Sequence, residues 1–233
     1  MAKKRIPWEE YLDKISDMLD TLTEEQHDIL TDHISVVKYK KNDIIYKEGD
    51  LPTNLLCLVS GKVKIYKDGV GGRPQIMRVL GETEYFAYRA YMADEPFITA
   101  AAAFEPCVVL KIPLGIIVKT IQENARLGWF FIQRLAHDLG QSDERTVNLT
   151  QKHIRGRLAE SLLFLKDSYG LEEDGSTLSI YMSREDLANL SNMTTSNAIR
   201  TLSAFAGEKL VAIDGRKIKF MNLQGLEKIS RIG

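Results

Sequence analysis

The sequence predicts an α+β fold in which an antiparallel β-roll precedes a long helix and a small helical domain. Three patterns support this class. Short β-type runs punctuated by glycine fill residues 36–113, apolar residues recur every three or four positions over 114–152, and two short helical patterns meet at a tight turn within 183–206. We therefore expect three parts, with boundaries at 1–113, 114–152 and 153–233.

Two helices are expected before the roll, over residues 8–34. Thr23 is expected to cap the second helix through Gln26. Within the roll, Cys57 and Cys107 lie in apolar runs, so we expect buried free thiols. The apolar face of the first helix is formed by Trp8, Tyr11, Leu12, Ile15 and Leu19.

The charge distribution limits the function. The chain carries a net charge of −1, divided as −3 over residues 1–150 and +2 over 151–233. This weak asymmetry excludes a domain that binds nucleic acid through overall charge, so any binding must come from local basic clusters. Two cysteines fall short of the four thiolates usual for an iron–sulfur cluster, which is therefore not expected. The sequence shows no signal-peptide core and no apolar run of about twenty residues, which predicts a cytoplasmic protein.

The stretch 183–206 predicts a helix–turn–helix. Ser183 and Thr194 precede the two helical patterns as N-cap residues, and the apolar face of the second helix leaves a polar face outward. An ordinary surface pair of helices would show the same spacing. The next segment favours DNA binding, because apolar and polar residues alternate over 209–220 around the turn signal Asp214-Gly215, as in a basic β-wing. The residues expected to contact DNA are Ser183, Arg184, Thr194, Thr195, Ser196, Asn197, Arg200, Arg216, Lys217 and Lys219.

The order of these parts resembles the bacterial cyclic-AMP receptor / fumarate-nitrate regulator (CRP/FNR) family of transcription factors over nearly the whole chain. The likeness is carried by the motifs KEGD at 47–50, SGKVKIY at 60–66, LGE at 80–82 and RGRLAESLLFL at 155–165. It implies a cyclic-nucleotide-binding-like jelly roll, a dimerisation helix and a winged helix–turn–helix.

The resemblance also implies where the reading helix departs from its relatives. Family members often carry an Arg-Glu pair early in that helix and an Arg one turn later. Thr195, Ser196 and Arg200 stand at these positions here. Arg200 can still bind guanine or phosphate, but the acceptor for cytosine is missing, so the DNA half-site should differ from the usual one.

Family members that bind cyclic nucleotides hold the cyclic phosphate with an Arg and a Ser. Aligned backward from AAFEPCVVLKI, these positions are Phe97 and Ile98, which cannot bind an anion. The family's pair of hydroxyl residues on the long helix corresponds to Ser142 and Asp143, where an acid disfavours a phosphate further. Cyclic AMP is therefore not the expected effector. The residues expected to line the effector space are Gly81, Glu82, Tyr85, Phe86, Phe97, Ile98, Thr99, Ser142 and Asp143.

The effector itself stays open. An apolar or aromatic molecule could occupy the space, or the chain's own Tyr and Phe side chains could fill it. Some relatives bind haem and sense nitric oxide or carbon monoxide, and a solvated surface histidine is the commoner alternative to a haem ligand. The imidazoles available as axial ligands are His27, His33, His137 and His153.

The apolar spacing over 114–152 is typical of a coiled-coil seam, which Ser142, Thr146 and Leu149 continue. A core helix packed only within its own chain would give the same spacing. A two-fold dimer is favoured, because paired reading helices can then meet half-sites one helical turn apart, roughly 34 Å. The expected dimer residues are Ile121, Ala125, Gly128, Ile132, Leu135 and Leu139.

The predicted function is therefore an effector-gated, homodimeric, sequence-specific DNA-binding transcription regulator. RNA polymerase is a candidate partner. Catalysis is not expected, because the sequence shows no metal-ligand cluster, phosphate loop or nucleophile–base motif. Two alternatives remain: a haem-dependent member of the same family that senses nitric oxide or redox state, and a ligand-binding or scaffold protein that does not bind DNA.

Overall fold

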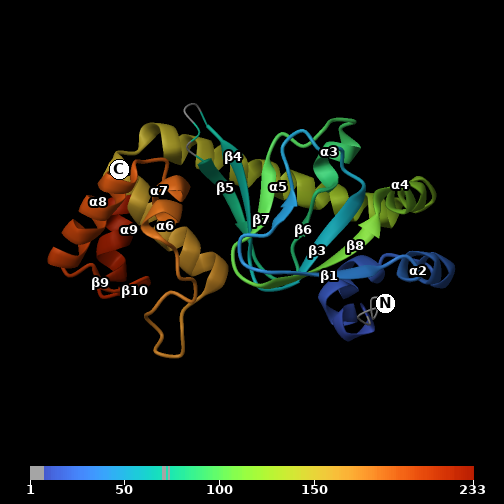
Figure 1. Ribbon diagram of the computed structural model, residues 1–233, viewed down its shortest axis with the longest axis horizontal. Coiled ribbons are helices and arrows are strands. Elements are labelled where there is room, and N and C mark those ends of the chain that lie inside the picture. Colours follow the sequence, from blue (N-terminus) through green and yellow to red (C-terminus); the bar gives the residue numbers. More distant parts are fainter. Residues whose placement is uncertain (1–7, 70–71, 73) are drawn as a thin grey trace. The chain divides into compact units, whose positions relative to one another are not determined.

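A computed structural model describes residues 8–69, 72 and 74–233 (Figure 1). The first seven residues of the expected N-terminal part lie outside this description. The chain divides into two compact units, of which unit 1 comprises residues up to Lys67 together with Met77–Leu139. Unit 2 comprises Asp68–Ile76 and Gly140–Gly233, so its second segment begins at residue 140, whereas the sequence analysis placed the last boundary at residue 153.

Unit 1 is built around two four-stranded sheets, with strand orders β1-β8-β3-β6 and β2-β7-β4-β5 (Figure 1). The registers described for these sheets are all antiparallel, which confirms the predicted roll. The strands are β1 (Ser35–Tyr39), β2 (Ile44–Tyr46), β3 (Asn54–Ser60), β4 (Val63–Asp68), β5 (Pro74–Leu80), β6 (Tyr85–Phe86), β7 (Ala100–Ala103) and β8 (Cys107–Pro113).

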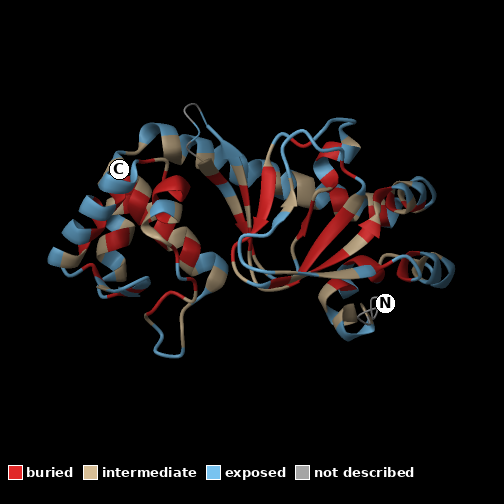
Figure 2. Cartoon of the chain, in the orientation of Figure 1, coloured by how far each residue is buried: buried red, intermediate tan, exposed pale blue. Residues whose placement is uncertain are grey.

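Strand β3 is buried on both of its faces, as the red colour along it shows (Figure 2). Because side chains alternate along a strand, Leu55 and Cys57 face one buried cluster while Leu56 and Leu58 face another. The first cluster includes residues of the flanking helices, and the second is shared with β4 and β7 of the other sheet. One sheet is thus covered by helices on one side and by the second sheet on the other. Cys57 and Cys107 are buried free thiols, as predicted.

The N-terminal helices are η1 (Trp8–Ile15, a 3₁₀ helix), α1 (Ser16–Leu19) and α2 (Glu24–Thr31). The predicted cap of α2 is confirmed. The Gln26 amide donates to Thr23 Oγ1 at 3.3 Å, and the Thr23 amide donates to Gln26 Oε1 at 3.2 Å. The short helix α3 (Tyr88–Met92) follows β6. The first of the two clusters, which includes Leu55 and Cys57 of β3, is called the helix-side cluster below. The N-terminal helices contribute Ile15, Met18 and Leu30 to it.

The single helix predicted over 114–152 is two helices, so that prediction was wrong. Helix α4 (Leu114–Glu123) ends at Asn124, which has extended backbone angles, and α5 (Ala125–Gln151) begins after it. The Asn124 side chain accepts a hydrogen bond from the Arg126 amide at 2.9 Å and donates one to the Thr21 carbonyl at 2.9 Å. Asn124 thus caps a new helix and is bonded to another segment of the chain. These bonds stabilise a break that the apolar spacing over 114–152 did not predict.

Unit 2 contains the predicted winged helix–turn–helix. Its elements after α5 are α6 (Ile154–Tyr169), α7 (Arg184–Leu190), α8 (Thr195–Gly207), β9 (Val211–Asp214), β10 (Lys217–Phe220) and α9 (Leu223–Ile232). Leu162, Leu187 and Phe205 are buried in its core. Arg145 of α5 joins two segments of this unit, because its Nη2 donates to the carbonyls of Ile76 at 2.7 Å and Leu190 at 3.0 Å. Among the described residues, the helices lack the combination of length and apolarity that a membrane-spanning helix needs.

Candidate nucleic-acid interface and effector space

Both helices of the helix–turn–helix begin at the predicted N-cap residues. Ser183 Oγ accepts a hydrogen bond from the Asp186 amide at 3.0 Å, and Thr194 Oγ1 accepts one from the Asn197 amide at 3.3 Å. A side-chain oxygen at this position satisfies an amide that the first helical turn leaves unpaired. The two caps therefore define where α7 and α8 start.

One face of α8 is buried and the other is exposed. Ala198, Leu202 and Phe205 pack into the core, as the sequence predicted. The exposed face contains a row that we call the reading edge. It consists of Thr195, Ser196, Ile199, Arg200 and Ser203. The predicted contact Asn197 lies at its border and is only partly exposed. Ile199 was missed by the sequence reasoning, although its spacing of three and four residues from Ser196 and Thr195 already placed it on this edge.

The wing is the antiparallel pair of β9 and β10. Its two-residue turn is Gly215-Arg216, one position later than the predicted Asp214-Gly215, because Asp214 pairs with Lys217 across the strands. Gly215 has a φ of 54°, in the left-handed region that hairpin turns require and that glycine adopts without strain. Arg184 Nη2 donates to the Gly215 carbonyl at 2.7 Å, so the start of α7 is tied to the tip of the wing.

The two wing lysines form ion pairs with the acidic loop that precedes the helix–turn–helix. Lys217 Nζ lies 3.7 Å from Glu172, and Lys219 Nζ lies 3.2 Å from Asp174. Hydrogen bonds also hold the loop itself, since Asp174 accepts from the amides of Thr177 and Ser176. These two amide hydrogen bonds hold the pKa of Asp174 well below its usual range, with smaller contributions from the Thr177 hydroxyl and from Lys219. Acidic partners thus already occupy the ammonium groups that were expected to bind phosphates.

Aromatic side chains of the region predicted to line the effector space pack against one another. Phe97 is buried and stacks on Tyr46, with ring centroids 3.9 Å apart, and Phe86 lies 6.5 Å from the same ring. Burial raises the pKa of Tyr46 to about 12. Ile98 is 52% exposed and points to solvent instead of into the sandwich. Two of the residues expected to line the effector space, Phe86 and Phe97, thus pack against the ring of Tyr46.

Two acids near this region differ from the prediction. Glu82, which was expected to line the effector space, is exposed and pairs with Lys14 at 2.8 Å. Glu84, which was not predicted, accepts a hydrogen bond from the Gly81 amide at 2.5 Å. The residue of this turn with a left-handed backbone is Thr83, which has a φ of 67°. The Glu84 carboxylate thus satisfies a backbone amide of the turn, a role that the sequence analysis did not predict.

Other residues expected to line the effector space lie in different parts of the structure. Tyr85 belongs to the helix-side cluster, whereas Phe86 belongs to the cluster between the sheets, because neighbouring strand residues point to opposite faces. The Tyr85 hydroxyl accordingly donates to Asp17 of α1 at 2.8 Å. Its assignment to the effector space was therefore wrong. Ser142 and Asp143 are exposed on the part of α5 that belongs to unit 2.

The exposed side of α5 in unit 1 carries a continuous row that we call the outer stripe. It consists of Ala125, Trp129, Ile132, Ala136 and Leu139, in the four-three spacing of a coiled-coil seam. Trp129, Ile132 and Leu139 are 59%, 54% and 63% exposed. Sequence reasoning missed Trp129 and Ala136.

Three of the six residues predicted for the dimer seam, Ile121, Gly128 and Leu135, do not belong to this stripe. Ile121 and Leu135 pack against the helix-side cluster of their own chain. The break at Asn124 removes Ile121 from the register of α5, and a Cβ at Gly128 would lie 3.4 Å from Ile121 Cγ2. The space over Gly128 is therefore taken by the same chain.

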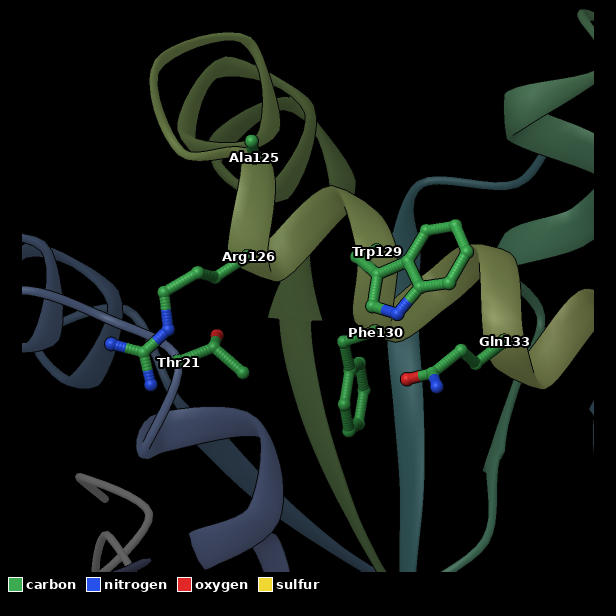
Figure 3. A pocket seen from close by; sticks show the side chains of 6 residues that line it. All are labelled: Thr21, Ala125, Arg126, Trp129, Phe130 and Gln133. Atoms are coloured by element: carbon green, nitrogen blue, oxygen red, sulfur yellow. The ribbon is translucent and has the colours of Figure 1, made fainter.

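A pocket of about 450 Å³ lies where α5 begins, beside the turn that follows α1 (Figure 3). Trp129, Phe130 and Gln133 of α5 line one side, and Arg126 extends toward Thr21 (Figure 3). Ala125 and Trp129 belong to both this pocket and the outer stripe. The pocket is thus part of the surface beside the stripe and separate from the predicted effector space between the sheets.

The four histidines do not form a buried site. His33, His137 and His153 are exposed, and His27 is half-buried on α2. His33 Nδ1 lies 2.8 Å from the Ile29 carbonyl. Within the described residues, groups of three or more His, Cys, Asp or Glu side chains with the arrangement of a metal site are absent. The imidazoles present do not fit the axial position of an enclosed haem.

Two family models match the chain, one over the β-roll and one over the helix–turn–helix. The cyclic nucleotide-binding domain model matches residues 36–124, and the Crp-like helix-turn-helix domain model matches residues 156–229. The chain belongs to the CRP/FNR family. It is therefore a regulator of the CRP/FNR type with a DNA-binding helix–turn–helix, as the resemblance implied.

Curated relatives of this CRP/FNR protein span most of its length. A CRP-like cAMP-activated global transcriptional regulator of Mycobacterium tuberculosis is 20% identical over 87% of this chain and 91% of its own. The global nitrogen regulator of Synechococcus elongatus is 23% identical over 81% and 86%, respectively. The anaerobic regulatory protein of Bacillus subtilis is 22% identical over 84% and 83%.

Solved structures show the same fold. FixK2 from Bradyrhizobium japonicum superposes with a TM-score of 0.76 at 21% identity, covering 84% of this chain and 96% of its own. A transcriptional regulator of the CRP/FNR family from Thermus thermophilus has a TM-score of 0.71 at 19% identity, covering 84% and 98%. At these identities the likeness establishes the CRP/FNR fold and leaves ligand and DNA sequence to the chain's own residues.

Proposed function

We propose that this regulator is an effector-gated homodimer that reads a specific DNA sequence and does not respond to cyclic AMP. The observation that carries the proposal is the reading edge of α8, where exposed Thr195, Ser196 and Arg200 stand beside the wing. A helix with small polar side chains and one arginine fits the major groove, in which arginine forms paired hydrogen bonds with guanine. The wing and the start of α7 supply groups for the phosphates.

The outer stripe supports the dimer. Three large apolar side chains in coiled-coil spacing are more than half exposed, and a second copy of α5 would cover them. A two-fold dimer would present two reading edges to half-sites roughly 34 Å apart. The proposed interface includes Trp129 together with three of the residues predicted from the sequence, Ala125, Ile132 and Leu139.

The proposal on cyclic AMP is supported by Phe97 and Ile98. Neither side chain can donate to a phosphate, and Phe97 is committed to its stack on Tyr46. The Mycobacterium tuberculosis relative is cAMP-activated by name, so the two proteins would differ in effector while sharing a fold. The haem-dependent alternative is not favoured, because the histidines lie at or near the surface.

The test is selection of bound sequences from a random duplex pool by the purified chain, with and without cyclic AMP and with and without haem. We expect an inverted repeat whose recovery is unchanged by cyclic AMP. Arg200→Ala should weaken binding to the recovered site by about 1–3 kcal/mol and leave random DNA little affected, as expected for a lost base contact. A scaffold protein would enrich no motif, and a motif recovered only with haem would establish the haem-dependent alternative.

A further inference from the structure

Ile199 is the apolar member of the reading edge. Its side chain is 47% exposed, whereas its neighbour Ala198 and the following Leu202 are fully buried. Burial of these two residues fixes the rotation of α8 about its axis, so Ile199 faces away from the core. It lies one residue before Arg200 and three residues after Ser196, in the middle of the surface proposed to enter the groove.

The chemistry of this side chain restricts what it can recognise. A branched aliphatic group neither donates nor accepts a hydrogen bond, and covering an amino or carbonyl group of a base without replacing its hydrogen bond is costly. The major-groove edges of the four bases carry one apolar group, the C5 methyl of thymine. A thymine methyl is therefore the complement of an exposed isoleucine at this position.

We propose that Ile199 reads a thymine in each half-site through its C5 methyl group, next to the base contacted by Arg200. The inference rests on the proposed function and adds a specificity-determining residue to it. Removing one methyl contact should weaken binding about fourfold per half-site, from the transfer free energy of a single methyl-sized group.

The test replaces each thymine of the selected operator in turn by deoxyuridine, which removes the methyl group and leaves base pairing intact. Dissociation constants are measured for the wild-type chain and for Ile199→Ala. We expect one thymine per half-site at which the wild type loses about fourfold in affinity and Ile199→Ala loses nothing. Ile232→Ala, at a 75% exposed isoleucine of α9, is the matched control and should retain the wild-type sensitivity.

The possible results separate the two proposals. If every replacement affects the wild type and Ile199→Ala equally, the role of Ile199 is overturned while sequence-specific binding stands. If the selection recovers no motif, both proposals are overturned. The assignment would also be overturned if Ile232→Ala, like Ile199→Ala, no longer lost affinity when thymine is replaced by deoxyuridine. The effect would then not be specific to the reading edge.

Discussion

The ring of Phe97 stacks on the ring of Tyr46 with their planes 18° from parallel and their centroids 3.9 Å apart. Tyr46 in turn packs against the cluster between the two sheets. The stack therefore holds in place a residue that was expected at the phosphate-binding position of relatives that bind cyclic nucleotides. It also makes Phe97 a structural residue of the sandwich.

Phe97→Ala should lower the free energy of unfolding by about 3 kcal/mol, because it removes a buried ring and leaves a cavity. Denaturant unfolding followed by tyrosine and tryptophan fluorescence measures the change. Ile98→Ala is the matched control, since Ile98 is 52% exposed and should change stability by no more than about 0.5 kcal/mol. Equal effects of the two substitutions would contradict the stacked arrangement.

Stability should fall in alkaline solution. Burial raises the pKa of Tyr46 to about 12, that of Cys57 to about 12 and that of Cys107 to about 11, from ordinary values of 10 for tyrosine and 9 for cysteine. Above its ordinary pKa each group loses its proton in the unfolded chain while keeping it in the folded chain. The unfolded state then binds fewer protons, so the free energy of unfolding decreases as the pH rises, until the folded groups also titrate.

Urea unfolding at a series of pH values from about 8 to about 11 measures this effect. The variant Cys57→Ala/Cys107→Ala should begin its decline at a higher pH, because only tyrosines then contribute. A free energy of unfolding that stays constant over the range would contradict the buried, protonated state of these groups.

Asn124→Ala should destabilise unit 1 by about 1–2 kcal/mol through loss of the α5 cap. The substitution also removes the donors to Thr21 O and to Gln26 Oε1 at 2.8 Å. Asn124→Asp keeps an acceptor for the Arg126 amide but lacks those donors, so its stability should lie between those of Asn124→Ala and the wild type. Thermal unfolding compares the variants, with exposed Gln122→Ala as the control. A control as unstable as Asn124→Ala would show that the cap has no special role.

Arg216→Gln should weaken DNA binding more than Lys219→Gln. Arg216 lies exposed at the tip of the wing, whereas Lys219 must give up its ion pair with Asp174 before it binds a phosphate. Across a salt series, the slope of log affinity against log salt concentration should decrease in magnitude by about two for Arg216→Gln, because the proposed dimer carries two copies of this residue. The decrease should be smaller for Lys219→Gln. The reverse order would mean that the acidic loop does not restrain the wing lysine.

Ile132→Glu combined with Leu139→Glu should convert the proposed dimer to monomers. Two carboxylates placed face to face with their symmetry mates in an apolar seam would be buried without partners. Sedimentation equilibrium measures the association state, and Gln133→Glu, at an exposed position beside the stripe, should remain dimeric. A dimeric double variant would place the interface elsewhere on the chain.

Local signals in the sequence were sufficient for most of the elements. Thr23, Ser183 and Thr194 each start a helix at the predicted residue, because capping depends on groups within one turn of the chain. The alternating pattern of the roll and the buried face of α8 were predicted for a similar reason. Periodicity alone decides which residues share a face.

Tertiary structure decided which partner each face meets. Tyr85 and Phe86 are equally aromatic in the sequence, and only the position of the sheet between helices and a second sheet places them in different clusters. Asn124 breaks the long helix because Thr21 and Gln26 are folded against it, and the wing lysines meet acids more than forty positions away in the chain. The sequence by itself therefore determined most of the elements and the polar face of α8. The packing of Tyr85 and Phe97 and the ion pairs of the wing lysines depended on contacts between distant segments, which no local pattern encodes.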